Sequence, residues 1–81
     1  MDPTAKRLVA CFTHVFPDLS EEEAVQASAT SVAKWDSLAS ITLLTLISEE
    51  FGVSLDVEDL GETPSFQAIL SRVRDGQEVA P

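Results

Sequence analysis

Two side chains near the start of the chain have types and a spacing that could support nucleophilic catalysis. Cys11 and His14 lie three residues apart, so on a helix they would be neighbours. A thiol beside an imidazole can form an activated nucleophile. However, no motif supplies an oxyanion hole or a third group that orients the imidazole. We therefore interpret Cys11 as part of the apolar side of a helix and His14 as its edge, and we predict no catalytic residues and no enzyme activity.

The composition of the chain does not favour metal binding either. One Cys and one His exclude a zinc cage with two or more thiolates, and no calcium-loop spacing or Gly-rich phosphate loop is present. We interpret the run Glu21-Glu22-Glu23 as a solvated face rather than a set of ligands. A single cysteine also excludes an internal disulfide, which fits a reducing compartment. We predict no metal site.

The tripeptide Asp36-Ser37-Leu38 is more informative, because it ends a long polar segment and begins a predicted helix. Ser37 would lie where free backbone N–H groups and the positive end of the helix dipole gather. A phosphate ester on its hydroxyl would be stabilised there. From these three residues alone, the plainer interpretation is that Asp36 and Ser37 only cap the helix.

The elements that must position Ser37 are predicted to be helical. The first helix covers about residues 4–16, begins after Asp2-Pro3 and ends at Pro17. Its apolar stripe consists of Leu8, Phe12, Val15 and Phe16. A long connection, residues 18–36, follows. It contains one capping-box pattern, Ser20 with Glu23, which predicts a short helical turn. Such long connections are often functional.

A second long helix is predicted between Asp36 and Gly52, because about fifteen residues between a cap and a glycine is helix length. It carries two apolar stripes. One consists of Leu43, Leu44, Ile47 and Phe51, and the other of Leu38, Ile41 and Thr45. A helix that is apolar on two faces is either central or offers a surface to a partner.

The last third of the chain predicts one short helical turn and one more amphipathic helix. The turn covers residues 56–61, capped by Asp56 and ended by Gly61. Thr63-Pro64 begins the last helix, Gly76 ends it, and residues 77–81 form a frayed tail. The fold class is therefore all-α: a small four-helix bundle of three main helices and one short helix, with a long first loop. We expect one domain, residues 1–81, with an ordered core over about residues 4–75.

The charge balance excludes several classes of partner. Five Lys and Arg against 14 Asp and Glu give a net charge of −9. Nucleic acid and anionic membrane surfaces would be repelled. The longest apolar-rich run, residues 38–47, is too short to span a bilayer, and no secretory leader precedes the first helix. We expect a cytoplasmic, free-standing protein.

The chain resembles the acyl carrier protein family over about residues 4–75. The residues that carry this resemblance are Trp35-Asp36-Ser37-Leu38, Glu49-Glu50-Phe51-Gly52-Val53, Pro17-Asp18-Leu19-Ser20, the Asp56 to Gly61 turn and Thr63-Pro64. The resemblance implies that Ser37 receives 4′-phosphopantetheine from coenzyme A, with Asp36 and Leu38 as the motif residues that the modifying enzyme reads. It also implies that acyl cargo is carried as a thioester on the terminal thiol. The implied partners are a phosphopantetheinyl transferase and enzymes that load and use the acyl group.

The same resemblance places the partner-binding surface on the helix that starts at Ser37 and on the short turn after it. The candidate contact residues are Leu38, Ile41, Thr45, Asp56, Glu58 and Asp59. No Lys or Arg occurs from Trp35 to Ser71, so this surface suits fast, weak docking onto basic patches. The same charges also keep a small protein soluble. A monomer is expected, since a carrier must leave its recognition helix free.

The sequence departs from the usual family pattern in one respect. Many such carriers have acidic residues just after the modified serine, whereas this chain has no carboxylate between Asp36 and Glu49. We therefore predict a dedicated set of partners rather than general fatty acid synthesis. Two alternatives stay open: a peptidyl or aminoacyl carrier, which the Asp before Ser37 disfavours, and an unmodified helical adaptor that uses the Leu38 and Ile41 face.

Overall fold

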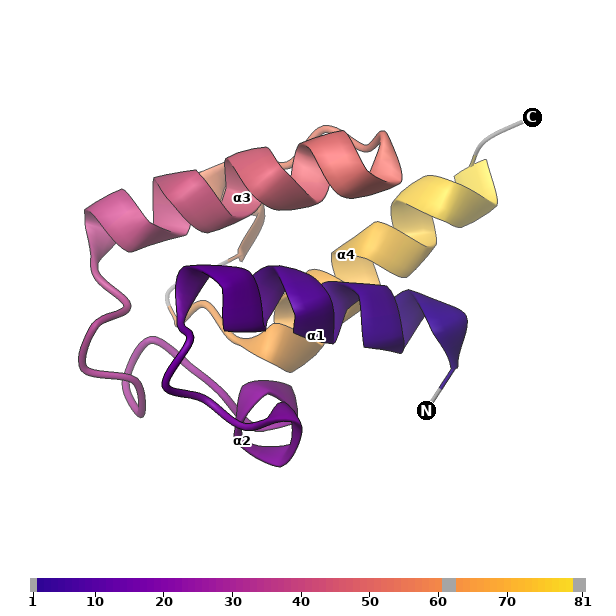
Figure 1. The fold of residues 1–81 in the computed structure, drawn as a ribbon. Coiled ribbons are helices and arrows are strands. Elements are labelled where there is room, and N and C mark those ends of the chain that lie inside the picture. Colours follow the sequence, from indigo (N-terminus) through magenta and orange to yellow (C-terminus); the bar gives the residue numbers. More distant parts are fainter. Residues whose placement is uncertain (1, 61–62, 80–81) are drawn as a thin grey trace.

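The structure, a computed structural model, describes residues 2–60 and 63–79 as a helical bundle (Figure 1). Its elements are α1 (Pro3–Val15), α2 (Glu21–Val25), α3 (Ser37–Phe51), the 3-10 turn η1 (Val57–Leu60) and α4 (Phe66–Val79). Helix α1 packs against α2, α3 and α4, while η1 lies against both α3 and α4. Three long helices with α2 confirm the predicted all-α class, and η1 confirms the short turn predicted after the second long helix. The end predicted for that turn, Gly61, lies outside the described residues.

Side-chain contacts with a neighbouring helix hold the start of α1 and the end of α3 in place. At the start of α1, Asp2 is the predicted N-cap, and its Oδ1 accepts the N–H of Ala5 at 2.8 Å. Its other oxygen pairs with Arg74 of α4 at 2.6 Å. Arg7 of α1 donates to the side chain of Glu50 at 3.1 Å and to the backbone carbonyl of Glu50 at 2.6 Å. Arg7 thus satisfies a carbonyl in the last turn of α3, where the helix itself has no basic residue.

Protonation of Asp2 should weaken the start of α1. The N–H of Ala5, and then Arg74, hold the pKa of Asp2 below its ordinary value of 3.8. The stabilisation is therefore fully present above that ordinary value and is lost as the pH falls through the lowered folded value. We expect the melting temperature of the wild type to drop more between about pH 5 and pH 3 than that of Asp2→Asn, measured by circular dichroism. Equal slopes for the two proteins would show that the cap contributes nothing that depends on charge.

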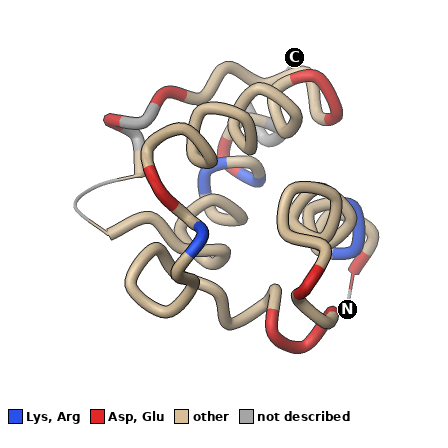
Figure 2. Tube along the Cα trace, turned by 60° about the vertical axis from the view of Figure 1, so that its left-hand side comes forward, with Lys and Arg blue, Asp and Glu red and all other residues tan. Residues whose placement is uncertain are grey.

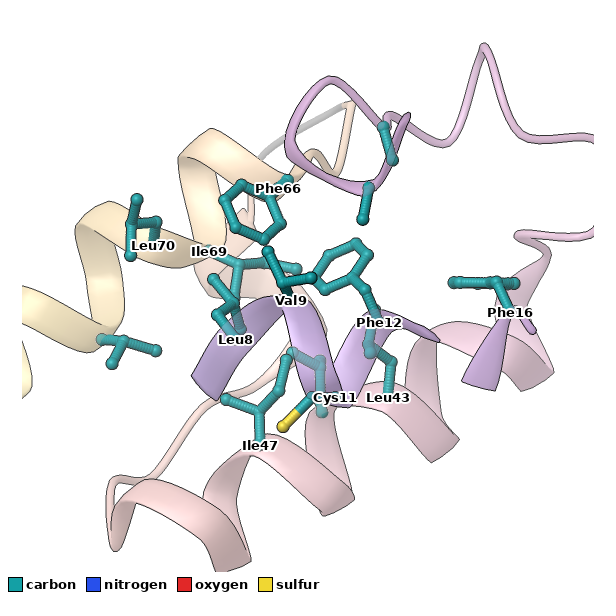
Figure 3. Close-up of a cluster of buried hydrophobic side chains, with 14 of the residues drawn as sticks. Leu8, Val9, Cys11, Phe12, Phe16, Leu43, Ile47, Phe66, Ile69 and Leu70 are labelled. Carbon is teal, nitrogen blue, oxygen red and sulfur yellow. The ribbon is translucent and has the colours of Figure 1, made fainter. Parts of the chain in front are cut away.

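The core is built around aromatic rings and lies where α1 crosses the other helices (Figure 3). Phe12 is fully buried and contacts three other rings, with centroid distances of 6.4 Å to Phe16, 5.4 Å to Trp35 and 5.1 Å to Phe66. These rings come from α1, from the long connection and from α4, so one cluster fixes three parts of the chain. Three members of the inner stripe predicted for α3, Leu43, Leu44 and Ile47, are buried, and Phe51 packs partly buried against them.

The start of the last helix differs from the prediction. Helix α4 begins at Phe66, and Ser65 rather than Thr63 caps it, since Ser65 Oγ accepts the N–H of Ala68 at 3.1 Å. Pro64 is held in an extended segment, because its carbonyl accepts the N–H of Ala29 at 2.8 Å. The N–H of Phe66 is bonded to the carbonyl of Ala27 at 2.9 Å. This pairing with the long connection delays the helix by two residues.

The end of the last helix also differs from the prediction. Helix α4 continues through Gly76 to Val79, so Gly76 is not its end, and residues 77–79 are helical rather than a frayed tail. A Cβ atom at position 76 would lie 2.9 Å from Cγ1 of Val53. The glycine therefore permits close packing against the segment that follows α3. No helix among the described residues is long and apolar enough to cross a membrane.

Candidate functional site

Ser37 is the first residue of α3, and its side chain is exposed. Asp36 precedes it as the N-cap with an extended backbone, as predicted. Asp36 Oδ1 accepts the N–H of Ala39 at 2.8 Å, and its carbonyl accepts the N–H of Ser40 at 2.9 Å. The side chain of Asp36 is thus engaged by the helix, and it acts as a structural cap directly beside the candidate hydroxyl.

Asp36 leaves the first two N–H groups of α3 unsatisfied. Within residues 2–60 and 63–79, the backbone N–H groups of Ser37 and Leu38 have no hydrogen-bond partner. The hydroxyl of Ser37 also has no partner among these residues. An exposed hydroxyl that is not held by the protein is available for modification. Two free N–H groups at the positive end of a fifteen-residue helix provide a favourable environment for a phosphate on it.

A buried hydrogen bond fixes the chain directly before the site. Trp35 is 4% exposed, and its Nε1 donates to Oγ of Ser40 at 2.8 Å. Ser40 lies one turn into α3 and is itself buried. The indole also packs against Phe12 and Phe16 of the core. Trp35 therefore anchors the end of the long connection, so that Asp36 and Ser37 meet the helix at a defined point.

Removal of the Ser40 hydroxyl should destabilise the protein without removing the site. In Ser40→Ala the indole N–H of Trp35 is left buried and unpaired, which costs about 1–3 kcal/mol. We expect the free energy of unfolding in urea to fall by that amount. The exposed Ser54→Ala is the matched control and should change it by less than about 0.5 kcal/mol. A loss no larger than that of the control would mean that the buried hydrogen bond contributes little.

Several of the charged residues near the site are already paired with each other or with other parts of the chain. Lys34, the nearest cation in the sequence, pairs with Asp18 at 2.7 Å, and both are exposed. Asp18 and Lys34 hold each other ionised: the hydrogen bond lowers the pKa of Asp18 and raises that of Lys34. Figure 2 shows α3 as a tan coil, without charged residues along its middle, between red acidic segments at its two ends. Of those acidic residues, Glu50 is already paired with Arg7.

The predicted contact residues lie on two neighbouring elements. Leu38 and Ile41 are 73% and 55% exposed, and Thr45 is exposed on the same helix. Asp56 and Glu58 are also exposed, at η1, which packs against α3. The side chain of Asp59 lies outside the described residues. The outer stripe of α3 thus points to solvent, and its contact with partners stays a prediction.

Cys11 and His14, the possible nucleophile and base, differ in burial. Cys11 is buried in the core, and burial raises the pKa of its thiol, so the thiolate is disfavoured. His14 is exposed and lines a surface pocket together with residues of α3. Among the described residues no group of three or more Cys, His, Asp or Glu could hold a metal ion. Sequence reasoning missed the position of His14 beside α3, because no local pattern reports how α1 and α3 pack.

Comparison with known families identifies the segment that contains this site. Residues 34–73 match the family described as "Phosphopantetheine attachment site". Comparisons with curated proteins and with solved structures gave no significant match. The matched segment includes Ser37, all of α3, η1 and the first half of α4. Domains of this family carry a 4′-phosphopantetheine group, are not catalytic themselves, and work with phosphopantetheinyl transferases and acyl-handling enzymes. The match over residues 34–73 and the helical fold are consistent with the acyl carrier protein family, which the sequence resembles.

Proposed function

We propose that the protein is an acyl carrier protein whose Ser37 bears 4′-phosphopantetheine. The observation that carries this proposal is the exposed, unbonded hydroxyl at the first residue of α3, inside the segment that matches the phosphopantetheine attachment family. Asp36 positions this hydroxyl by capping the helix, and Leu38 presents an apolar side chain, 73% exposed, beside it.

The residues around Ser37 fit a phosphodiester. The N–H groups of Ser37 and Leu38 are free to donate to phosphate oxygens, and the helix dipole favours negative charge at this end. Asp36 is the one carboxylate adjacent to the site in sequence, and the N–H of Ala39 engages its Oδ1. The exposed position leaves room for an arm that extends into solvent and reaches partner enzymes.

The modification is a phosphoryl transfer for which this chain supplies only the acceptor. Ser37 Oγ forms a bond to the pantetheine-bearing phosphorus of coenzyme A, and the hydroxyl proton leaves to a base of the transferase. The bond between that phosphorus and the bridging oxygen breaks, and adenosine 3′,5′-bisphosphate is released. The group then supplies a thiol that holds cargo as a thioester. The chain itself provides a fixed attachment point and a surface that raises the local concentration of cargo at a docked enzyme.

The surface of α3 supports a dedicated partner set. From Ser37 to Ser48 the helix carries no charged residue, so basic patches that read acidic carriers find no carboxylate there. We infer that the protein acts as a monomer in a specialised acyl pathway, because Leu38 and Ile41 must stay accessible. The aspartate before Ser37 favours acyl over aminoacyl cargo.

The proposal is tested by the intact mass of the purified chain after incubation with coenzyme A and a broad-specificity phosphopantetheinyl transferase. We expect the mass to increase by one phosphopantetheinyl group. An established acyl carrier protein in a parallel reaction controls for transferase activity. No increase in a reaction where the control is fully modified would refute the proposal and favour an unmodified adaptor.

A further inference from the structure

Two successive residues at the start of α3 have side chains that can cap the helix. Asp36 is the N-cap in the structure, and its Oδ1 accepts the N–H of Ala39 at 2.8 Å. Ser37 follows directly, and serine is about as good an N-cap as aspartate. If Ser37 capped the helix instead, its Oγ would accept the N–H of Ser40. We call the observed arrangement the Asp36 register and the alternative the Ser37 register.

The two registers differ in whether the hydroxyl of Ser37 is free. In the Asp36 register Ser37 is helical and exposed, and its side chain has no hydrogen bond to the described residues. In the Ser37 register its oxygen would turn back toward the first turn of the helix and accept a backbone N–H. An oxygen held in that way has a lone pair engaged and faces the helix rather than an approaching enzyme. The Asp36 register therefore presents the better acceptor for a phosphoryl group.

Cap preference alone does not separate the two registers. Aspartate and serine rank about equally as N-caps. In the Asp36 register the N–H of Ser40 donates to the carbonyl of Asp36 at 2.9 Å. In the Ser37 register the same N–H would donate to Oγ of Ser37, so this donor is satisfied in both. The choice between the registers is therefore left to contacts from outside the helix.

The buried hydrogen bond between Trp35 and Ser40 spans both possible caps. Trp35 Nε1 donates to Oγ of Ser40 at 2.8 Å, and the two residues are 4% and 6% exposed. The ring centroid of the indole lies 5.4 Å from that of Phe12 and 5.8 Å from that of Phe16. The backbone N–H of Trp35 donates to the carbonyl of Val32 at 3.0 Å. The segment from Trp35 to Ser40 is therefore fixed at both ends.

This fixed span fits the Asp36 register and not the Ser37 register. A helical residue advances the chain by about 1.5 Å along the axis, and an extended residue by about 3.3 Å. A change of Ser37 from helical to extended would therefore move Trp35 about 2 Å away from Ser40. A hydrogen bond of 2.8 Å is broken by such a displacement. Formation of the bond thus favours the register in which the hydroxyl of Ser37 is free.

We propose that Trp35 and Ser40 are positioning residues for the modification of Ser37: their buried hydrogen bond selects the Asp36 register and so keeps the acceptor hydroxyl free. The proposal rests on the proposed function of Ser37, and it assigns no contact between Trp35 or Ser40 and coenzyme A. It gives Ser40 a role beyond stability, because the register at the start of α3 can change in a protein that stays folded.

The first test measures the register in the unmodified protein by nuclear magnetic resonance, without any enzyme. Backbone carbon chemical shifts distinguish a helical serine from an extended N-cap serine, and the wild type should give helical shifts for Ser37. Trp35→Phe keeps an aromatic ring but removes the N–H donor, and Ser40→Ala removes the acceptor. In each variant we expect the Ser37 shifts to move about two-thirds of the way to extended values, because the two caps are then nearly equal and the helix start frays.

Ile69→Val is the control for a general loss of stability. Ile69 is fully buried in α4, and the change removes one methyl group from the core without touching the start of α3. A purely structural role of the Trp35–Ser40 bond predicts that all three single variants behave alike once they are folded. The proposal predicts instead that the Ser37 shifts of Ile69→Val stay those of the wild type.

The second test measures kcat/KM for the carrier with coenzyme A and a broad-specificity phosphopantetheinyl transferase. It is done at a temperature where circular dichroism shows that each variant is folded. Trp35→Phe and Ser40→Ala should each lower kcat/KM about threefold, because about a third of the molecules keep the Asp36 register. Ile69→Val should stay within about 1.5-fold of the wild type, because its register does not change.

The double variant Trp35→Phe/Ser40→Ala distinguishes one shared hydrogen bond from two separate effects. Both changes remove the same bond, so the double variant should also be about threefold slower than the wild type. Independent effects would multiply to about ninefold and would contradict a single selecting bond. If Trp35→Phe does not fold, Ser40→Ala alone decides the question, because it leaves the aromatic rings in place.

The outcomes separate this proposal from the assignment of Ser37. Helical Ser37 shifts in the folded variants, or kcat/KM values equal to that of Ile69→Val, would overturn the role of the Trp35–Ser40 bond. Extended Ser37 shifts in the wild type would overturn it as well. A wild type that is never modified, beside an established carrier that is, would instead refute Ser37 as the attachment point, while its chemical shifts would still report the register.

Discussion

Replacement of Ser37 with alanine is expected to abolish attachment of phosphopantetheine while leaving the fold intact. The hydroxyl is the acceptor atom of the proposed transfer, and no other group can replace it at the start of α3. Its side chain makes no hydrogen bond to the described residues, and it is exposed, so its loss creates no cavity and no unpaired partner. Intact mass should show no adduct. This result corresponds to a loss of at least about a thousandfold in the rate of modification.

Ser54→Ala is the matched control for this variant, because Ser54 is also exposed and lies outside the helices. It should be modified at the wild-type rate. Thermal melts of Ser37→Ala and of the wild type should agree within about 2 °C. An adduct that survives in Ser37→Ala would place the attachment point on another residue, and an unfolded Ser37→Ala would show that the serine has a structural role.

Phe12→Ala should cause a large loss of stability. Phe12 is fully buried and contacts Phe16, Trp35 and Phe66. Removal of the ring leaves a cavity and separates three parts of the chain, at a cost of about 3–5 kcal/mol. A domain of this size has a stability near the low end of about 5–15 kcal/mol. We therefore expect a protein that is partly or fully unfolded at 37 °C.

Urea denaturation followed by far-ultraviolet circular dichroism measures this effect. Phe12→Leu serves as the conservative control and should lose less than half as much stability, because leucine still fills most of the cavity. If Phe12→Ala lost less than about 1 kcal/mol, the ring cluster would not be the centre of the core.

Local patterns were sufficient to predict the helix that carries the site. The bounds of α3 follow from Asp36, which accepts an N–H of the first turn, and from Gly52, which adopts a φ of 66° at its end. Both devices act within four residues, so the sequence shows them directly. The same holds for the capping box between Ser20 and Glu23, in which each residue satisfies a backbone N–H of the other.

Contacts between distant residues explain what the sequence did not predict. The N–H of Ala29 bonds to Pro64 across the fold, and this pairing moves the start of α4. Gly76 lies within α4, where it leaves room for Val53, instead of ending the helix. Arg7 pairs with Glu50 from 43 positions away, and so removes one acid from the surface that the charge pattern offered to partners.

The sequence was sufficient to predict which residue forms the candidate site, but not the contacts that surround it. Ser37 stands out because a cap, a hydroxyl and an apolar residue follow one another. The free N–H groups, the anchored Trp35 and the pocket beside His14 depend on tertiary packing and could be seen only in the structure.

The position of Trp35 also gives the molecule a built-in optical reporter. The chain has one tryptophan and no tyrosine, so ultraviolet emission excited at long wavelength comes from a single indole. That indole lies two residues before Ser37. It is buried, and its nitrogen donates a hydrogen bond to Ser40 of α3, the helix proposed to bind partners. Shifts in the wavelength or lifetime of its fluorescence can therefore report cargo loading and partner docking in real time, without an attached dye.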